Sequence, residues 1–138
     1  MPRSITLSQA QAVVAACTAE ADAVGQPMNV AVVDSGGNLV AFAAMDATKL
    51  VGEEISQLKA QTAVHFHADT RDLAPLVQPG APLYGIESTA GGRWVVFGGG
   101  VVLRDGAGEV VGGVGVSAGT VEEDHQVAEA GRRAFGEG

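Results

Sequence analysis

The stretch Glu109-Val-Val-Gly-Gly-Val-Gly-Val-Ser117 combines valine, a strong strand former, with glycine. We therefore predict a β-strand whose glycines let a helix or a ligand pack closely against it. The segment Gly112–Gly119 matches neither the dinucleotide pattern nor the P-loop pattern, and an acidic helix start follows it, so phosphate binding is not expected. Thr120-Val-Glu-Glu123 has the form of a capping box and predicts the start of the final helix.

Two glycine-containing turns predict antiparallel hairpins. Ser35-Gly-Gly-Asn38 joins a predicted strand over 29–34 to a return strand over 39–45. Asp105-Gly-Ala-Gly108 joins Val101–Arg104 to the valine–glycine strand in the same way. Both hairpins place neighbours in the sequence side by side in one antiparallel sheet.

The remaining elements follow from helical spacing and from one further apolar run. They are, in chain order, a helix that begins after the Thr6–Gln9 capping box and ends at Gly25, a helix over Lys49–Phe66, a short helix over Thr70–Pro75, a loop over Gln78–Ala90 and a strand over Arg93–Phe97. The steps that indicate the second helix are Leu50, Ile55, Leu58, Thr62 and Phe66.

The resulting order of elements is α-β-β-α-α-β-β-β-α. Strands joined largely by tight turns predict an α+β fold, in which helices pack on a five-stranded antiparallel sheet. The sequence contains no internal repeat beyond the two hairpins, no low-complexity tract and no linker. We therefore predict a single domain over residues 1–138.

Composition excludes several classes of protein. Of 138 residues, 46% are hydrophobic and 17% are charged, which is unlike a disordered chain. The net charge of −8 disfavours nucleic acid as a partner because phosphates would be repelled. No apolar stretch is long enough to suggest a membrane span or a signal core, so we predict a cytoplasmic protein with no membrane partner. The one cysteine excludes an internal disulfide.

A few residues could carry chemistry. His125 follows Asp124 near the start of the final helix, and its imidazole could be a packed core group, an iron ligand or a proton carrier. Lys59, in the middle of the second helix, is a surface residue or a cation for a ligand carboxylate. Cys17 lies on the buried stripe of the first helix and is a core residue or a weaker candidate for a metal ligand. His65 and His67 point in different directions on a helix and cannot share one metal.

Several segments, taken in order and spacing, resemble one family. They are Thr6–Ala10, Val30-Ala-Val-Val-Asp-Ser-Gly-Gly-Asn-Leu39, Phe42–Asp46, Lys59-Ala60, Phe97-Gly-Gly-Gly100, Val111–Ser117 and Asp124-His125 followed by Ala128. The chain resembles the GlcG/HbpS-like haem-binding family, which includes the C-terminal domain of PduO-type corrinoid adenosyltransferases. The likeness runs through nearly the whole chain. It departs from the family pattern at Ala47, where glycine is common, and at Val101, where proline is common.

The resemblance implies a profilin- or PAS-like sheet, homo-oligomers from dimer to octamer, and haem as a cofactor of some members. On that basis His125 is the first candidate for an iron ligand, and Cys17, His65 and His67 are the others. The scarcity of aromatic residues, 4% of the chain, weakens a haem role because haem pockets usually stack aromatic side chains on the ring.

Three functions remain open from the sequence. The first is a small-ligand protein that binds haem or another tetrapyrrole. The second is a small cofactor-independent enzyme acting on an organic acid or ring compound, with Lys59 holding a carboxylate and the Asp124–His125 pair transferring protons. The third is a structural oligomer that stabilises a partner enzyme. For either of the first two we predict that Gly98, Gly99 and Gly100 converge with Lys59, Asp124 and His125 on one site, where the glycine amides would bind an anion.

We expect the protein to be a homo-oligomer. A glycine-rich chain with 46% hydrophobic and only 17% charged residues leaves apolar surface that a second copy can cover. Light scattering at low micromolar concentration should give a multiple of the 13.9 kDa chain mass. A monomer mass would contradict this expectation.

Overall fold

A computed structural model describes residues 4–136 of the chain. Its helices are α1 (Leu7–Val24), α2 (Val51–Phe66), α3 (Thr70–Leu73) and α4 (Val121–Phe135). Its strands are β1 (Asn29–Asp34), β2 (Leu39–Ala44), β3 (Gly100–Arg104) and β4 (Val110–Ser117). Short 3-10 turns lie between α3 and β3, namely η1 (Ala74–Val77), η2 (Ile86–Ser88) and η3 (Ala90–Gly92). The predicted single domain over 1–138 extends at both ends beyond the described residues.

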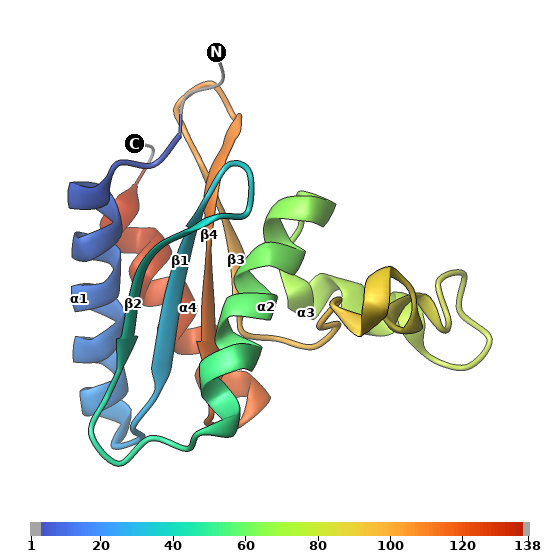
Figure 1. Cartoon of the computed structure of the whole chain (residues 1–138), viewed down its shortest axis with the longest axis horizontal. Helices are drawn as coiled ribbons and strands as arrows, with labels where there is room; N and C mark the ends of the chain where they lie inside the picture. The colour runs from blue at the N-terminus through green and yellow to red at the C-terminus, as the bar shows by residue number, and fades with distance from the viewer. Residues whose placement is uncertain (1–3, 137–138) are drawn as a thin grey trace.

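The strands form one antiparallel sheet between two layers of helices. The strand order is β2-β1-β4-β3, so the valine–glycine strand β4 is central. Helices α1 and α4 cover one face of the sheet and α2 covers the other (Figure 1). The segment between η1 and β3 projects away from this body (Figure 1). The α+β class is therefore confirmed.

One face of the sheet carries large aliphatic side chains. Val114 and Val116 of β4 lie beside Val30 and Val32 of β1, and together they contact the buried faces of α1 and α4. Because side chains alternate along a strand, the residues between these valines point to the opposite face. In β4 the residues on either side of Val114 are Gly113 and Gly115.

The glycine face lets the backbone of α2 lie directly on the sheet. A methyl group at Gly115 would overlap the carbonyl oxygen of Ser56, and one at Gly113 would lie 2.8 Å from the carbonyl oxygen of Ala60. Gly100 of β3 is equally close to the backbone of Lys59. The predicted reason for the glycines, close packing against a helix, is confirmed.

The predicted second helix is confirmed as α2, but most of the residues whose spacing indicated it lie off its buried face. Leu50 precedes the helix and is 88% exposed, and Ile55, Leu58 and Phe66 are only partly buried. The face that meets the sheet is made of mostly small residues: Gly52, Ser56, Lys59, Ala60, Thr62, Ala63 and Val64. Small residues are needed there because the helix backbone approaches the sheet too closely for large side chains.

The predicted fifth strand over Arg93–Phe97 is also wrong, and the sheet has four strands in the described part of the chain. Residues 93–96 have no regular secondary structure, and the Val95 amide donates to the hydroxyl of Thr62 on α2. The outer edge of β3 is instead satisfied by side chains. Thr70 Oγ1 accepts from the Gly100 amide at 2.9 Å, and Asp69 Oδ1 accepts from the Val102 amide at 3.1 Å.

The local signals that predicted turns and helix starts are confirmed. Thr6 and Thr120 each form a complete capping box, and Gly25 ends α1 in the left-handed conformation. The side chains of Asp34 and Asp105 accept backbone amides across the two hairpin turns. Within residues 4–136 no helix combines the length and apolarity needed to cross a bilayer.

We expect Gly115→Ala to destabilise the fold by about 2–3 kcal/mol, because the new methyl group would push α2 off the sheet. Urea unfolding followed by circular dichroism measures the change. Gly36→Ala is the matched control, since Gly36 lies in an exposed turn where the new methyl would meet only flexible side chains. Equal stability losses for the two variants would contradict the close contact.

Candidate functional site

A buried ion pair joins α2 to the first turn of α4. Lys59 Nζ lies 2.7 Å from Asp124 Oδ2 and also donates to the carbonyl oxygen of Val116 at 2.8 Å. The Lys59 residue is 0% exposed. Asp124 Oδ1 accepts from the Gly119 amide at 2.8 Å, so both carboxylate oxygens are used. The pair therefore fixes the end of β4 and the start of α4 relative to α2.

The attraction between Lys59 and Asp124 opposes the cost of burying their two charges. Burial lowers the pKa of the Lys59 ammonium and raises the pKa of the Asp124 carboxyl, and the attraction between the two groups opposes both shifts. The carboxylate also lies in the first turn of α4, where the helix dipole favours a negative charge. A buried charge without its partner would be far less stable.

The triple glycine packs against this pair. Gly99 has φ 124°, and a methyl group on it would lie 2.6 Å from Lys59 Nζ and 2.7 Å from the Val116 carbonyl oxygen. Its own carbonyl accepts from the Val116 amide, and the Gly100 amide donates to Thr70. These glycines are required for close packing, and the Gly100 amide is already used, which differs from the predicted anion-binding loop.

A pocket of about 340 Å³ opens beside the ion pair. Its lining comes from α3 and η1, from the bend that precedes β3, and from the first turns of α4: Arg71, Ala74, Phe97, Gly98, Val121, Glu122 and His125. Phe97 and Val121 are 43% and 41% exposed, so the pocket has an apolar rim. The Phe97 ring centroid lies 5.1 Å from Lys59 Nζ, so the Lys59 ammonium lies behind the part of the pocket wall that Phe97 forms.

His125 carries the buried side-chain nitrogen of the pocket that lacks a partner within the described residues. It is 8% exposed, and its buried Nδ1 has no hydrogen-bond partner among the described residues. Burial lowers the pKa of the imidazole, and the Arg71 guanidinium lowers that pKa further, while Glu129 and Asp69 oppose the shift. The ring is therefore kept neutral, which is the form that binds a metal or accepts a proton.

The structure brings together part of the predicted set. Gly98 and His125 line the pocket, whereas Lys59 and Asp124 lie behind its wall and are bonded to each other. A free ammonium for a ligand carboxylate, as predicted for Lys59, is therefore not what this geometry offers. The sequence analysis missed Arg71, which supplies the basic group of the pocket. The scarcity of basic residues, 8 in the chain, was the one signal that could have drawn attention to it.

The other predicted metal ligands lie elsewhere. Cys17 is packed in the core against Gly131 of α4, where burial raises the pKa of its thiol to about 12. His65 lies in the last turn of α2 beside Trp94, and His67 ends that helix in the left-handed conformation. Among residues 4–136, no three His, Cys, Asp or Glu side chains gather as a metal site would require.

A larger hollow of about 610 Å³ lies between the end of α1 and the end of β2. Its titratable side chains are the carboxylates of Asp22 and Asp46. Size alone does not make it a ligand site. The smaller pocket has an unpaired buried imidazole and a guanidinium, so we take the smaller pocket as the candidate site.

Comparisons with known proteins agree with this fold. A family described as haem degrading protein HbpS-like matches residues 5–133. A 15.0 kDa protein of the dhaT–dhaS intergenic region of Citrobacter freundii is 41% identical over 136 residues, which are 97% of this chain and 94% of that protein. The corrinoid adenosyltransferase PduO of Salmonella typhimurium is 43% identical over 104 residues, which are 75% of this chain but 30% of PduO.

A solved structure, that of a PduOC:haem complex, superposes with a TM-score of 0.93 at 35% identity. The match covers 98% of this chain and 97% of that one.

We expect Asp124→Asn to destabilise the protein by about 3–5 kcal/mol, because it leaves the Lys59 ammonium buried without a charged partner. The free energy of unfolding in urea measures this loss. The double variant Lys59→Met with Asp124→Asn should recover part of the stability, since it buries no charge and an Asn oxygen can still accept the Gly119 amide. A double variant less stable than the single one would contradict the ion pair's role.

Proposed function

The chain belongs to the HbpS-like family, and on that premise we propose that it binds haem or another tetrapyrrole carrying carboxylates in the pocket between α3 and α4. In this proposal His125 is the iron ligand and Arg71 pairs with a carboxylate of the ligand. Bound haem would supply a redox-active iron. The protein's part is to hold the ring, to offer a neutral imidazole and to neutralise negative charge.

The observation that carries the proposal is the unpaired His125 ring beside Arg71 in an apolar pocket. Buried polar atoms in folded proteins almost always have partners, so an orphaned imidazole nitrogen calls for a group that the chain does not itself provide. Iron requires the neutral imidazole, and burial together with Arg71 favours that form. The guanidinium fits the planar geometry of a carboxylate.

The size of the pocket limits the affinity. A volume of about 340 Å³ lies near the lower end of the range for small-molecule sites, roughly 300–1,000 Å³. Part of a tetrapyrrole would therefore remain outside the described pocket. Phe97 is the one aromatic side chain in the lining, so stacking is limited. We expect modest rather than tight binding.

An enzyme that uses His125 and Asp124 as a proton-transfer pair is less well supported. Such a pair needs a carboxylate that accepts from the imidazole. Both oxygens of Asp124 are instead bonded to Lys59 and to the Gly119 amide. The geometry therefore favours ligand binding over acid–base catalysis, and it favours a role for Asp124 in supporting the pocket wall.

Haem titration followed by the Soret band tests the proposed function. His125→Ala should shift the Soret maximum and weaken binding by roughly tenfold or more, and Arg71→Ala should weaken binding by a few-fold, because a charge-assisted hydrogen bond contributes about 1.5–3 kcal/mol when buried and less at a pocket rim. Matched controls are His65→Ala and Arg93→Ala, which remove the same residue types outside the pocket. Affinity that is tight and insensitive to both pocket substitutions would refute the proposal.

The pH dependence of binding follows from the lowered pKa of His125. A free imidazole is half protonated near pH 6.5, with the usual pKa of about 6.5, and the pKa in this pocket lies lower. Haem binding should therefore persist as the pH falls through about 6.5 and weaken only at lower pH, where the imidazole gains its proton. The His125→Ala variant should lack this component. A loss of affinity centred above pH ~6.5 in the unsubstituted protein would contradict a neutral, buried His125.

A further inference from the structure

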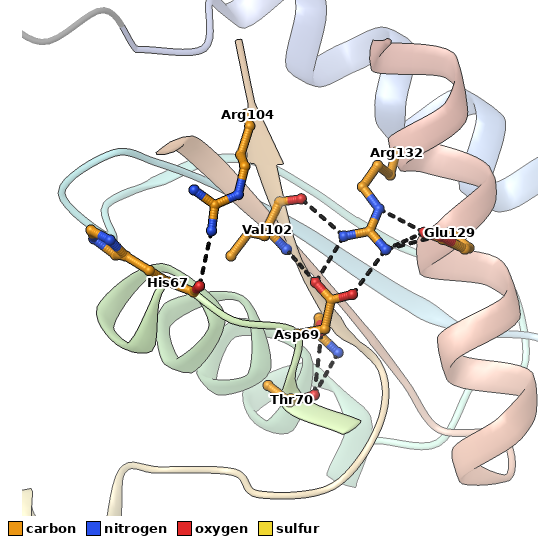
Figure 2. Close-up of polar contacts among 8 residues, drawn as sticks. His67, Asp69, Thr70, Val102, Arg104, Glu129 and Arg132 are labelled. Atoms are coloured by element: carbon orange, nitrogen blue, oxygen red, sulfur yellow. Dashed lines mark hydrogen bonds and ion pairs between the residues drawn. The ribbon is translucent and has the colours of Figure 1, made fainter. Parts of the chain in front are cut away.

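The residue that precedes α3 is tied to α4 by a bidentate ion pair. Arg132 Nη1 and Nη2 lie 2.8 Å from the two carboxylate oxygens of Asp69 (Figure 2). Asp69 belongs to the segment that leads into α3, so the bond crosses from one element to another. Its side chains are largely buried, with 29% and 12% exposure for Arg132 and Asp69. Two parallel bonds to a carboxylate fix direction as well as distance.

The two residues that follow Asp69 connect the Asp69–Arg132 bridge to β3 and to the pocket. Asp69 also accepts from the Val102 amide, and the next residue, Thr70, is fully buried and accepts from the Gly100 amide (Figure 2). The residue after that is Arg71, which lines the pocket. Three successive residues therefore bind α4, bind β3 and reach the ligand site.

Arg132, which pairs with Asp69, lies on the same helix as His125 of the pocket. His125 and Arg132 are separated by two turns of α4, and Glu129 lies between them on the same face. The Asp69–Arg132 bridge thus links the element that carries Arg71 to the helix that carries His125. The Val102 carbonyl also accepts from Arg132 at 3.3 Å, which ties the bridge to the sheet edge.

We propose that Asp69 and Arg132 are positioning residues of the pocket, which set the separation of Arg71 and His125 without contacting the ligand. The proposal rests on the proposed function, because it concerns the same site. A ligand that touches both Arg71 and His125 binds well only if the two groups are held at the right separation. When the bridge is lost, α3 can move relative to α4. Part of the binding free energy is then needed to order α3, so the affinity falls.

The critical variant is Asp69→Asn, with Glu129→Gln as its matched control. Each removes one negative charge that faces Arg132 and that opposes the lowered pKa of His125. Only Asp69 connects two elements, since Glu129 bonds Arg132 within α4. Asp69→Asn should weaken haem affinity roughly threefold to tenfold, and Glu129→Gln should change it by less than about twofold. Equal effects of the two variants would overturn the proposal.

A double-mutant cycle separates positioning from a general loss of stability. If the bridge acts through Arg71, Asp69→Asn should weaken haem affinity by less than about twofold when residue 71 is already alanine. A merely structural effect would weaken binding by the same factor in both backgrounds, and that result would overturn the proposal. Circular dichroism and the Tm of each variant show that the titrations are made on folded protein.

Arg132→Lys is the second variant if Asp69→Asn does not fold. It keeps the positive charge but cannot hold the Asp69 carboxylate with two parallel bonds, so haem affinity should fall. Unchanged affinity would count against the bridge. The outcomes also distinguish the two proposals. If Arg71→Ala and His125→Ala weaken binding but Asp69→Asn and Arg132→Lys do not, only the positioning role fails. If neither pocket substitution weakens binding, the proposed function fails and the positioning role fails with it.

Discussion

The contact between the backbone of α2 and the glycines of β4 is the constraint on which the rest of the structure depends. Gly113 and Gly115 leave no side chain between the helix and the sheet, so the two backbones touch. At this distance Lys59 can extend its ammonium to the end of β4 and to the first turn of α4. The position of α4, and with it the position of His125, therefore follows from the missing side chains of one strand.

Several buried polar groups near the pocket have partners within the chain, whereas the Nδ1 atom of His125 has none among the described residues. The outer edge of β3 is bonded by the side chains of Asp69, Thr70 and Arg132 instead of by another strand. Lys59 and Asp124 satisfy each other. His125 is left with a buried Nδ1 that has no partner in the described part of the chain, and the residue itself lines the pocket.

The successes and failures of the sequence analysis have different physical causes. Capping boxes, glycine turns and the valine–glycine strand are local, since the residues that specify each one are its own. Arg93–Phe97 has the composition of a strand, but a strand also needs a neighbour, and the free edge of β3 is already occupied by side chains from residues 69 and 70. Helical spacing predicted α2 itself, but it could not reveal which face meets the sheet, because the close approach of the backbones favours small residues there.

The sequence by itself determined the hairpins, the starts of α1 and α4 and the α+β class, because these depend on short-range geometry or on motifs whose residues lie together in the chain. Only the tertiary structure decided that Lys59 is buried against Asp124, that Arg71 faces the pocket and that Asp69 bridges to Arg132. These residues are separated from their partners by more than 50 positions in the chain. Long-range pairing of charges is set by how the elements pack, and no local pattern encodes which acid a given base will meet.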